Sequence, residues 1–275
     1  MEITVNGAKF WYEEVGRVTD PASPSCLLVH GGPGTDHAYF RPWMDELGCD
    51  LRLVYYDHRG HGRSERRNPK EGTLEQLVDD MEGLRQALGL GKIVLLGSSF
   101  GGFLSLLYAV RYGQHLSRLI LVGAASSHHF RERADANAEA RATSEIKAAL
   151  RRMWDGSIKS DEDYRKAFET IMPLYFYRRE DASKMNKETI YRIDIRNFII
   201  QTQIPRFDVR GQLKEIQVPT LVTVGRHDWI CPVDQAEIIH RGIAGSQLAI
   251  FERSGHNPFI EEPESFFATV RRFLG

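Results

Sequence analysis

The sequence predicts an α/β fold in which a mostly parallel sheet is flanked by helices. Short apolar runs at residues 26–29, 51–56, 93–96 and 118–122 alternate with polar loops and helical patterns. This alternation is typical of parallel strands that helices cover on both faces. The alternation stops over residues 126–213, where we see helical patterns and no strong strand, and it resumes with the apolar run at 219–224. We therefore expect a sheet domain that is interrupted by an inserted helical segment.

The individual elements follow from local signals. Residues 3–5 and 10–12 flank Asn6-Gly7, a pair that favours a type I′ turn, and this predicts an antiparallel hairpin. We expect a helix over residues 36–47. Thr73 opens a Thr-x-x-Gln capping box, which predicts a helix that runs to about residue 88. The later expected elements are a helix at 103–110, a strand at 219–224, a helix at 233–241, a strand at 247–251 and a helix at 263–274.

The domain organisation predicted from this order is a single α/β domain with an insertion. Residues 1–125 and 214–275 form the predicted core, and residues 126–213 form a predicted helical cap. A chain of 275 residues with 42% hydrophobic residues is large enough to bury a sizeable core.

Composition excludes several classes of partner. The chain has 36 basic and 37 acidic residues, and this balance favours neither nucleic acid nor an anionic membrane surface. No apolar run approaches the ~20 residues of a membrane-spanning helix, and the first residues do not resemble a signal peptide. The three cysteines, Cys26, Cys49 and Cys231, lack metal-ligand spacing. We expect a cytoplasmic protein with reduced cysteines and without metal, cofactor, nucleic-acid or membrane partner.

The most informative motif is Gly97-Ser98-Ser99-Phe100-Gly101, which fits the pattern G-x-S-x-G. It lies between a predicted buried strand and a predicted buried helix. In this setting the pattern forms a sharp turn that exposes the serine hydroxyl above the sheet, and the flanking glycines avoid steric collisions. Ser99 is therefore the predicted nucleophile.

A serine nucleophile needs a base, and the base needs a group that orients it. Asp228 follows the predicted strand at 219–224, and His256 follows the strand at 247–251. Carboxyl ends of parallel strands meet at one edge of the sheet, so Ser99, Asp228 and His256 should lie together. Read alone, Asp228 could be a turn former and His256 a surface residue. The order of the three along the chain favours catalysis.

The oxyanion formed on attack needs N–H donors. We expect one from Phe100, directly after Ser99, and one from Gly32 in the sequence His30-Gly31-Gly32-Pro33-Gly34. The alternative is that these glycines only form a tight turn.

These motifs resemble those of the α/β-hydrolase superfamily over nearly the whole chain. The segments 30–34, 57–64 and 97–102 are most similar to the proline iminopeptidases. The resemblance implies a cofactor-free serine hydrolase that releases N-terminal residues from short peptides. It also implies a helical cap whose acidic side chains hold the substrate's amino group. The segment 57–64 is interpreted as a structural loop near the rim of the site.

Two positions depart from the family pattern. Phe100 stands where the proline enzymes often have Trp, and Arg206 aligns with the glutamate that grips the substrate ammonium. Arg206 is thus a candidate substrate-binding residue, unless it is exposed and the alignment is displaced. The first hypothesis is a serine hydrolase of the iminopeptidase type. The departure at Arg206 supports a second hypothesis, a carboxylesterase or lactonase with the same triad. The third hypothesis is a ligand-binding receptor on a hydrolase fold. A small molecule or short peptide is the partner that the sequence predicts.

Overall fold

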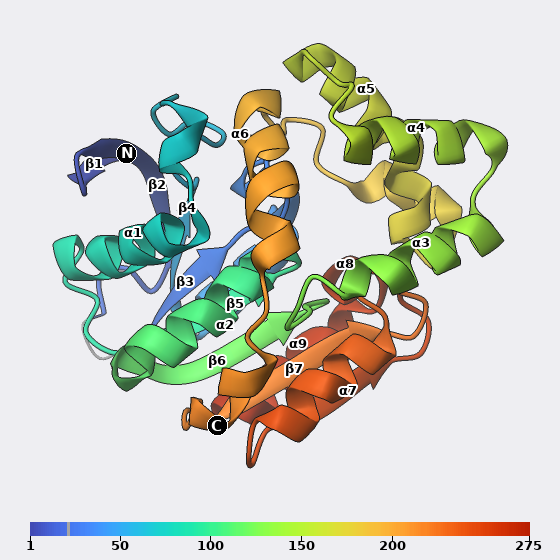
Figure 1. Cartoon of the computed structure of the whole chain (residues 1–275). Helices are drawn as coiled ribbons and strands as arrows, with labels where there is room; N and C mark the ends of the chain where they lie inside the picture. The colour runs from blue at the N-terminus through green and yellow to red at the C-terminus, as the bar shows by residue number, and fades with distance from the viewer. Residues whose placement is uncertain (21–22) are drawn as a thin grey trace.

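An eight-stranded sheet runs through the structure, which is a computed structural model that describes residues 1–20 and 23–275 (Figure 1). The strand order is β1-β2-β4-β3-β5-β6-β7-β8. Strand β2 is antiparallel to both of its neighbours, and the strands from β4 to β8 are parallel. The predicted mostly parallel sheet is therefore confirmed. The strands are β1 (Glu2–Val5), β2 (Ala8–Gly16), β3 (Ser25–Val29), β4 (Arg52–Tyr56), β5 (Ile93–Ser98), β6 (Leu116–Val122), β7 (Thr220–Gly225) and β8 (Gln247–Phe251).

Both faces of the sheet are buried, and successive strand residues alternate between two hydrophobic cores. In β3, Leu27 and Val29 lie in the core shared with α1 and α2, whereas Cys26 and Leu28 lie in the core shared with α9. Burial on both faces explains why the strands are continuous apolar runs in the sequence. The flanking helices are α1 (Leu74–Ala87), α2 (Phe100–Tyr112), α7 (Val233–Gly242), α8 (Pro258–Glu261) and α9 (Pro263–Leu274).

Two local signals give the predicted structures. Asn6 and Gly7 have φ angles of 48° and 72°, as a type I′ turn requires, and they join β1 to β2. Thr73 caps α1, because its side-chain oxygen accepts a hydrogen bond from the backbone N–H of Gln76 at 3.2 Å.

The helix expected over residues 36–47 is not present. The segment contains two short 3₁₀ helices, η1 (His37–Phe40) and η2 (Trp43–Cys49). Arg41 between them has an extended backbone (φ −90°, ψ 142°), as is common for a residue that precedes proline. Pro42 therefore divides the segment.

The interval 126–213 is helical and lies beside and above the sheet in Figure 1. Its described residues form no strand, and the pair Ser127–Asp208 makes an isolated bridge. The boundaries of core and cap given above stay predictions. The interval contains α3 (Phe130–Arg141), α4 (Ser144–Asp155), α5 (Asp161–Ile171), α6 (Ile193–Phe198), the π-helical turn η7 (Ile199–Gln203) and the 3₁₀ helices η5 (Met172–Tyr175), η6 (Arg179–Lys184), η8 (Ile204–Arg206) and η9 (Arg210–Glu215).

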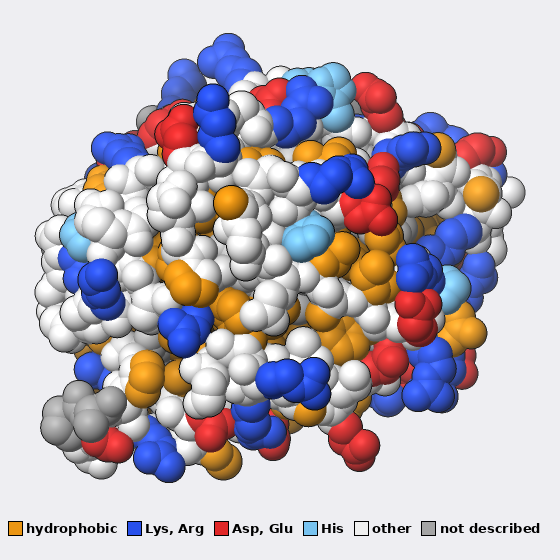
Figure 2. Space-filling model, turned by 90° about the horizontal axis from the view of Figure 1, so that it is seen from below, with side chains coloured by type: hydrophobic (Ala, Val, Ile, Leu, Met, Phe, Trp, Pro, Cys, Tyr) orange, Lys and Arg blue, Asp and Glu red, His pale blue; other side chains and the backbone are white. Residues whose placement is uncertain are grey.

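The surface shows no strong segregation of charge on the face drawn in Figure 2, where basic and acidic side chains are interspersed. None of the helices in the described residues is long and apolar enough to cross a membrane. The three cysteines are free thiols: Cys26 and Cys231 are buried, and Cys49 is exposed.

Candidate active site

Polar residues gather where the parallel strands end. Ser99 directly follows β5, Asp228 follows β7 and His256 follows β8. Because these strands are parallel neighbours or near neighbours in the sheet, their carboxyl ends meet at one edge. The topology thus places the three residues at the same edge of the sheet.

Ser99 has a strained backbone at the turn between β5 and α2. Its φ of 56° and ψ of −124° lie in a region that residues with a Cβ rarely adopt. Its N–H donates a hydrogen bond to the Val122 carbonyl at 2.9 Å. A Cβ at Gly97 would lie 2.5 Å from the Gly101 carbonyl oxygen, and a Cβ at Gly101 would lie 2.0 Å from the Val29 carbonyl oxygen. The turn is therefore possible only with glycine at both positions.

Asp228 and His256 form a buried pair. Oδ2 of Asp228 lies 2.6 Å from Nδ1 of His256, and both side chains are buried. The other carboxylate oxygen of Asp228 accepts hydrogen bonds from the N–H groups of Ile230 and Cys231 at 2.9 and 3.0 Å. Nε2 of His256 is buried and has no hydrogen-bond partner among the described residues. One ring nitrogen is thus held, and the other is available.

A pocket of about 570 Å³ contains Ser99 and His256 in its wall. Its lining includes aromatic and Met side chains of the interval 126–213, so the helical segment covers the sheet edge here. Among the residues that the structure describes, no Asp, Glu, Lys or Arg belongs to this lining. The lining residues are Gly31, Gly32, Thr35, Tyr39, Ser99, Phe168, Met172, Tyr175, Met185, Asn186, Thr189, Tyr191, His256 and Asn257.

The loop at 30–34 passes close to Ser99. A Cβ at Gly31 would lie 3.0 Å from the Ser99 Cβ, and the Gly31 N–H donates to the Tyr39 hydroxyl at 2.8 Å. Gly32 has a φ of 123°, which glycine alone adopts without strain, and it is exposed to the pocket. Phe100, which directly follows Ser99 in the chain, is the first residue of α2.

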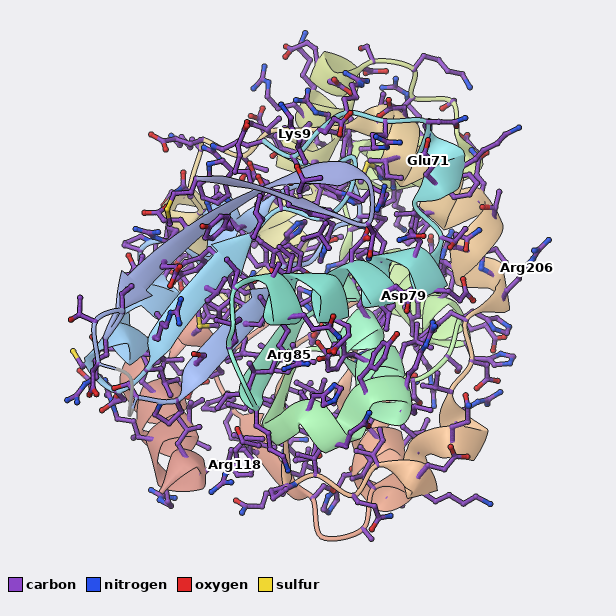
Figure 3. The ribbon with its side chains drawn as sticks, turned by 90° about the vertical axis from the view of Figure 1, so that its left-hand side faces the viewer. Lys9, Glu71, Asp79, Arg85, Arg118 and Arg206 are labelled. Carbon is purple, nitrogen blue, oxygen red and sulfur yellow. The ribbon has the colours of Figure 1, made fainter. Side chains whose placement is uncertain are left out.

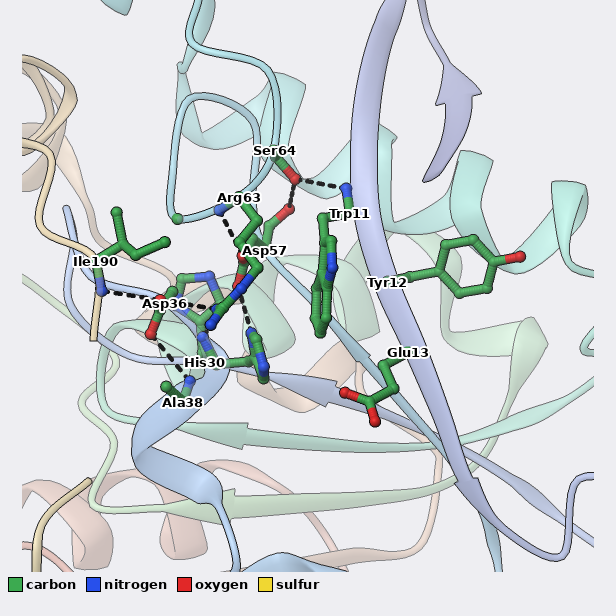
Figure 4. Close-up of polar contacts among 12 residues, drawn as sticks. Trp11, Tyr12, Glu13, His30, Asp36, Ala38, Asp57, Arg63, Ser64 and Ile190 are labelled. Atoms are coloured by element: carbon green, nitrogen blue, oxygen red, sulfur yellow. Dashed lines mark hydrogen bonds and ion pairs between the residues drawn. The ribbon is translucent and has the colours of Figure 1, made fainter. Parts of the chain in front are cut away.

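The loop at 57–64 is held by hydrogen bonds around Asp57, which Figure 4 shows. Oδ1 of Asp57 lies 2.7 Å from Nδ1 of His37, and Oδ2 accepts the N–H of Arg63 at 2.7 Å. Its carbonyl accepts the Ser64 hydroxyl at 2.6 Å, and that hydroxyl in turn accepts the Trp11 N–H. A Cβ at Gly62 would lie 2.3 Å from Oδ2 of Asp57, so this glycine is required. These contacts agree with a structural role for the motif.

Comparison with known proteins identifies the family. The family described as the alpha/beta hydrolase fold matches residues 24–263. The chain belongs to this family. It is 32% identical to the proline iminopeptidase PfmaB of Pestalotiopsis fici, over 99% of this chain and 98% of that protein. It is also 32% identical to the proline iminopeptidase of Saccharolobus solfataricus, over 91% of this chain and 84% of that protein.

A solved structure agrees with this assignment. The structure of a thermophilic esterase from Thermogutta terrifontis is 26% identical and matches with a TM-score of 0.74, over all of this chain and 97% of that one. The chain is thus a hydrolase of the α/β-hydrolase fold, and it is similar to proline iminopeptidases.

Arg206 lies away from the pocket that Ser99 and His256 line. It lies in η8, its side chain is exposed, and it is absent from the lining of the Ser99 pocket. Figure 3 shows it pointing outward from the molecule. This placement favours the alternative in which Arg206 is a surface residue and the alignment with the family glutamate is displaced.

Sequence reasoning did not single out Arg196, which the structure buries near the site. It lies in α6, is 3% exposed and lines a second cavity beside the Ser99 pocket. The one signal in the sequence is its setting, because Ile193, Ile195 and Ile199 around it predict a buried stretch. An arginine within such an apolar stretch predicts a buried positive charge, but the sequence does not show which group compensates that charge.

Proposed function

We propose that this chain is a serine hydrolase in which Ser99, His256 and Asp228 act as a catalytic triad. The observation that carries the proposal is the Asp228–His256 hydrogen bond of 2.6 Å, which leaves Nε2 of His256 unpaired in the wall of the pocket that Ser99 also lines. A hydroxyl with a neighbouring base that a carboxylate orients is the arrangement of nucleophilic catalysis.

In the proposed mechanism the Ser99 oxygen attacks the substrate carbonyl while Nε2 of His256 takes the hydroxyl proton. The tetrahedral intermediate collapses, the bond to the leaving group breaks, and His256 gives its proton to that group. Water then attacks the acyl-enzyme by the same route and releases the acid. Asp228 holds the His256 tautomer that keeps Nε2 free to accept the proton, and it stabilises the imidazolium.

We propose that the N–H groups of Gly32 and Phe100 stabilise the oxyanion. The N–H of Gly31 is bound to the Tyr39 hydroxyl, which supports Gly32 as the donor of this loop. Phe100 begins α2, where the first N–H groups lack partners within the helix. Two such donors beside Ser99 would bind the developing negative charge.

We further propose residues 126–213 as the cap over a core of 1–125 and 214–275. This division is supported by the lining of the Ser99 pocket, to which the cap contributes Phe168 and Tyr191 and the core contributes Gly31 and His256. The cap would then select the substrate.

The names of the relatives support short peptides or aminoacyl amides as the first substrate class. A second candidate, hydrolysis of small esters or lactones, is favoured by a specific observation: the described residues place no carboxylate in the lining of the Ser99 pocket. Binding of a free ammonium group in a largely apolar pocket needs a nearby anion to offset desolvation.

One assay separates these candidates. The purified protein is given proline 4-nitroanilide, other aminoacyl 4-nitroanilides, short-chain 4-nitrophenyl esters and simple lactones, with Ser99→Ala as control. Amide hydrolysis that Ser99→Ala abolishes would establish the peptidase type. Ester or lactone hydrolysis without amide turnover would establish the second candidate. Absence of any Ser99-dependent hydrolysis would contradict the proposed function.

A further inference from the structure

A second cavity of about 360 Å³ adjoins the Ser99 pocket. The two share Gly32, Phe168 and Tyr175 in their walls, so the second lies directly beside the first. It is enclosed by α4, α5 and α6, by the 30–34 loop and by the residues that follow Asp228. Most of its lining is apolar: Leu150, Met153, Trp154, Phe168, Ile171, Ile200 and Ile230.

Arg196 brings a positive charge into this apolar cavity. Its side chain is 3% exposed, and no carboxylate of the described residues pairs with it. The guanidinium makes a long contact of 3.4 Å from Nη1 to the Asn197 side-chain oxygen, and it lies 5.0 Å above the centre of the Tyr164 ring. Arg59, which is also buried, differs sharply, because Asp80 binds it through two hydrogen bonds of 2.7 Å.

A buried cation without an anion is unfavourable. Removal of a guanidinium from water costs several kcal/mol unless charge or hydrogen bonds compensate it. Burial lowers the pKa of Arg196 from its ordinary value, and the neighbouring hydroxyls of Tyr164 and Tyr175 oppose this shift only in part. The cation–π contact with Tyr164 offsets a part of this cost. An anion from outside the chain would offset more of it.

A second unpaired donor lies in the same cavity. The indole N–H of Trp229 is buried, has no hydrogen-bond partner among the described residues, and belongs to a residue of the cavity wall. A carboxylate fits these two groups. Its negative charge would offset that of the guanidinium, and its two oxygens could accept hydrogen bonds from the guanidinium and from the indole N–H.

We propose that this cavity is a subsite for a carboxylate group of the substrate, with Arg196 as its cation and Trp229 as a further donor. The inference rests on the proposed function, because it names the class of substrate that Ser99 would hydrolyse: an acyl compound with an acid group at one end. An ammonium group would be repelled by Arg196, which also fits the lack of carboxylates in the Ser99 pocket.

The position of Arg196 is coupled to the loop beside Ser99. A Cβ at Gly34 would lie 2.5 Å from the Arg196 Cβ, so the loop backbone packs directly on this side chain. The N–H of Arg192 donates to the Gly34 carbonyl at 2.8 Å, and the Tyr164 hydroxyl donates to the Pro33 carbonyl at 2.9 Å. The cation is thereby held at a fixed position relative to the glycines that we propose for the oxyanion.

The test compares acidic and neutral esters of equal chain length. The 4-nitrophenyl half-esters of succinic, glutaric and adipic acid are paired with 4-nitrophenyl butyrate, pentanoate and hexanoate, and Ser99→Ala supplies the background rate. We expect kcat/KM to favour the acid in at least one pair by about 10–100-fold, as a charge-assisted hydrogen bond provides. Arg196→Met should abolish this preference, and Arg196→Lys should retain a part of it.

Each preference is a ratio within one variant, so partial unfolding of a variant does not affect it. Arg151→Met, which replaces an exposed arginine of α4, is the matched control and should keep the wild-type ratio. Ser99-dependent hydrolysis with equal rates for acid and neutral esters, unchanged in Arg196→Met, would overturn the subsite and leave the proposed function intact.

If neither the esters nor the amides are hydrolysed in a Ser99-dependent way, calorimetry with free glutarate and adipate tests the subsite by itself. Binding to the wild type that Arg196→Met removes would support the subsite although the proposed function had failed. No binding in that case would overturn both.

Discussion

Ser99 is the residue at which backbone strain and the proposed chemistry coincide. Its left-handed φ of 56° costs about 1–3 kcal/mol for a residue with a Cβ. The strain persists because Ser99 is fixed by hydrogen bonds to its own turn and to β6, with Gly102 N–H donating to the Ser99 carbonyl at 2.8 Å. The strain at Ser99 thus lowers the free energy of unfolding at the position from which the proposed nucleophile enters the pocket.

This strain predicts a difference between two inactive variants. Ser99→Gly removes the Cβ and relieves the strain, whereas Ser99→Ala keeps it. We expect Ser99→Gly to be more stable than Ser99→Ala by about 1 kcal/mol in urea denaturation, and both to lose about 10³-fold or more of the hydrolytic rate. Equal stability of the two variants would show that the turn is not strained.

The triad candidates are predictable from sequence, and the substrate-contacting residues are not. Ser99, Asp228 and His256 each follow an apolar run, and parallel pairing brings such ends together whatever the details of packing. Arg196 is different, because its burial depends on how α6 packs on the loop at Gly34. Arg206 was singled out by alignment alone, and an alignment cannot determine which way a side chain points.

At the scale of elements, α2 depends on close approach at its first turn. The Cβ of an alanine at position 101 would lie 2.0 Å from the Val29 carbonyl oxygen, which belongs to β3 and cannot give way. At the other end of the helix, Gly113 has helical backbone angles and no atom within 4 Å of a built Cβ. Gly101 in the first turn of α2 and Gly113 at its C-terminal cap thus differ in the side chains that they can accept.

We therefore expect opposite effects of the same substitution. Gly101→Ala should lower the free energy of unfolding by about 3 kcal/mol or more, or prevent folding, because the clash involves backbone. Gly113→Ala should leave it unchanged or raise it by about 0.5–1 kcal/mol. Urea denaturation measures both. A tolerated Gly101→Ala would contradict the described geometry of the turn.

The loop that carries His256 is held by a carboxylate with a shifted pKa. Glu261 of α8 accepts the Gly255 N–H at 2.7 Å and the Tyr177 N–H at 2.6 Å. Burial raises the pKa of Glu261 from 4.5 to about 7. A carboxyl whose pKa is higher in the folded state favours folding in its protonated form, so its contribution is full below the unfolded pKa and is lost as pH rises through about 7.

This sign predicts a pH-dependent difference between the wild type and Glu261→Gln. Between about pH 5 and about pH 8, the wild type should lose about 1–3 kcal/mol of unfolding free energy relative to Glu261→Gln, whose amide does not titrate. Denaturation at both pH values measures the loss. The exposed Glu264→Gln is the control and should follow the wild type. Parallel curves for wild type and Glu261→Gln would refute the raised pKa.

Most elements were predictable because strong local signals agree with the fold. The Asn6-Gly7 hairpin and the Thr73 cap are examples, and the strands are buried on both faces as their apolar runs indicated. The prediction of a helix over residues 36–47 was wrong, because the apolar pattern does not reveal how Pro42 divides the segment. Two 3₁₀ turns bury Phe40 and Met44 as well as a helix would.

At the scale of the whole molecule, a buried ion pair connects three parts of the chain. Arg59 of the 57–64 loop binds Asp80 of α1, and it also donates to the Asn6 carbonyl of the first hairpin at 3.1 Å. The Asn6 amide in turn donates to Asp80 at 3.0 Å. The hairpin, the loop and α1 are therefore joined through one charged cluster.

Removal of one partner should be costly. Asp80→Ala leaves the buried Arg59 guanidinium with a single long ion pair, the 3.6 Å contact with Glu71, and we expect a loss of about 3 kcal/mol of unfolding free energy. Glu162→Ala breaks the exposed pair with Arg165 on α5 and should leave the urea midpoint unchanged. Similar urea midpoints for Asp80→Ala and Glu162→Ala would mean that the Arg59–Asp80 pair does not hold the hairpin, the 57–64 loop and α1 together.

The central claim is that Ser99 is a nucleophile activated by His256, and covalent labelling tests it most directly. The protein is treated with a fluorophosphonate, and intact mass and peptide mapping locate the adduct. We predict one adduct per chain on Ser99, no adduct in Ser99→Ala, and labelling slowed by at least about 10²-fold in His256→Ala. Labelling at another residue, or an unchanged rate in His256→Ala, would contradict the triad.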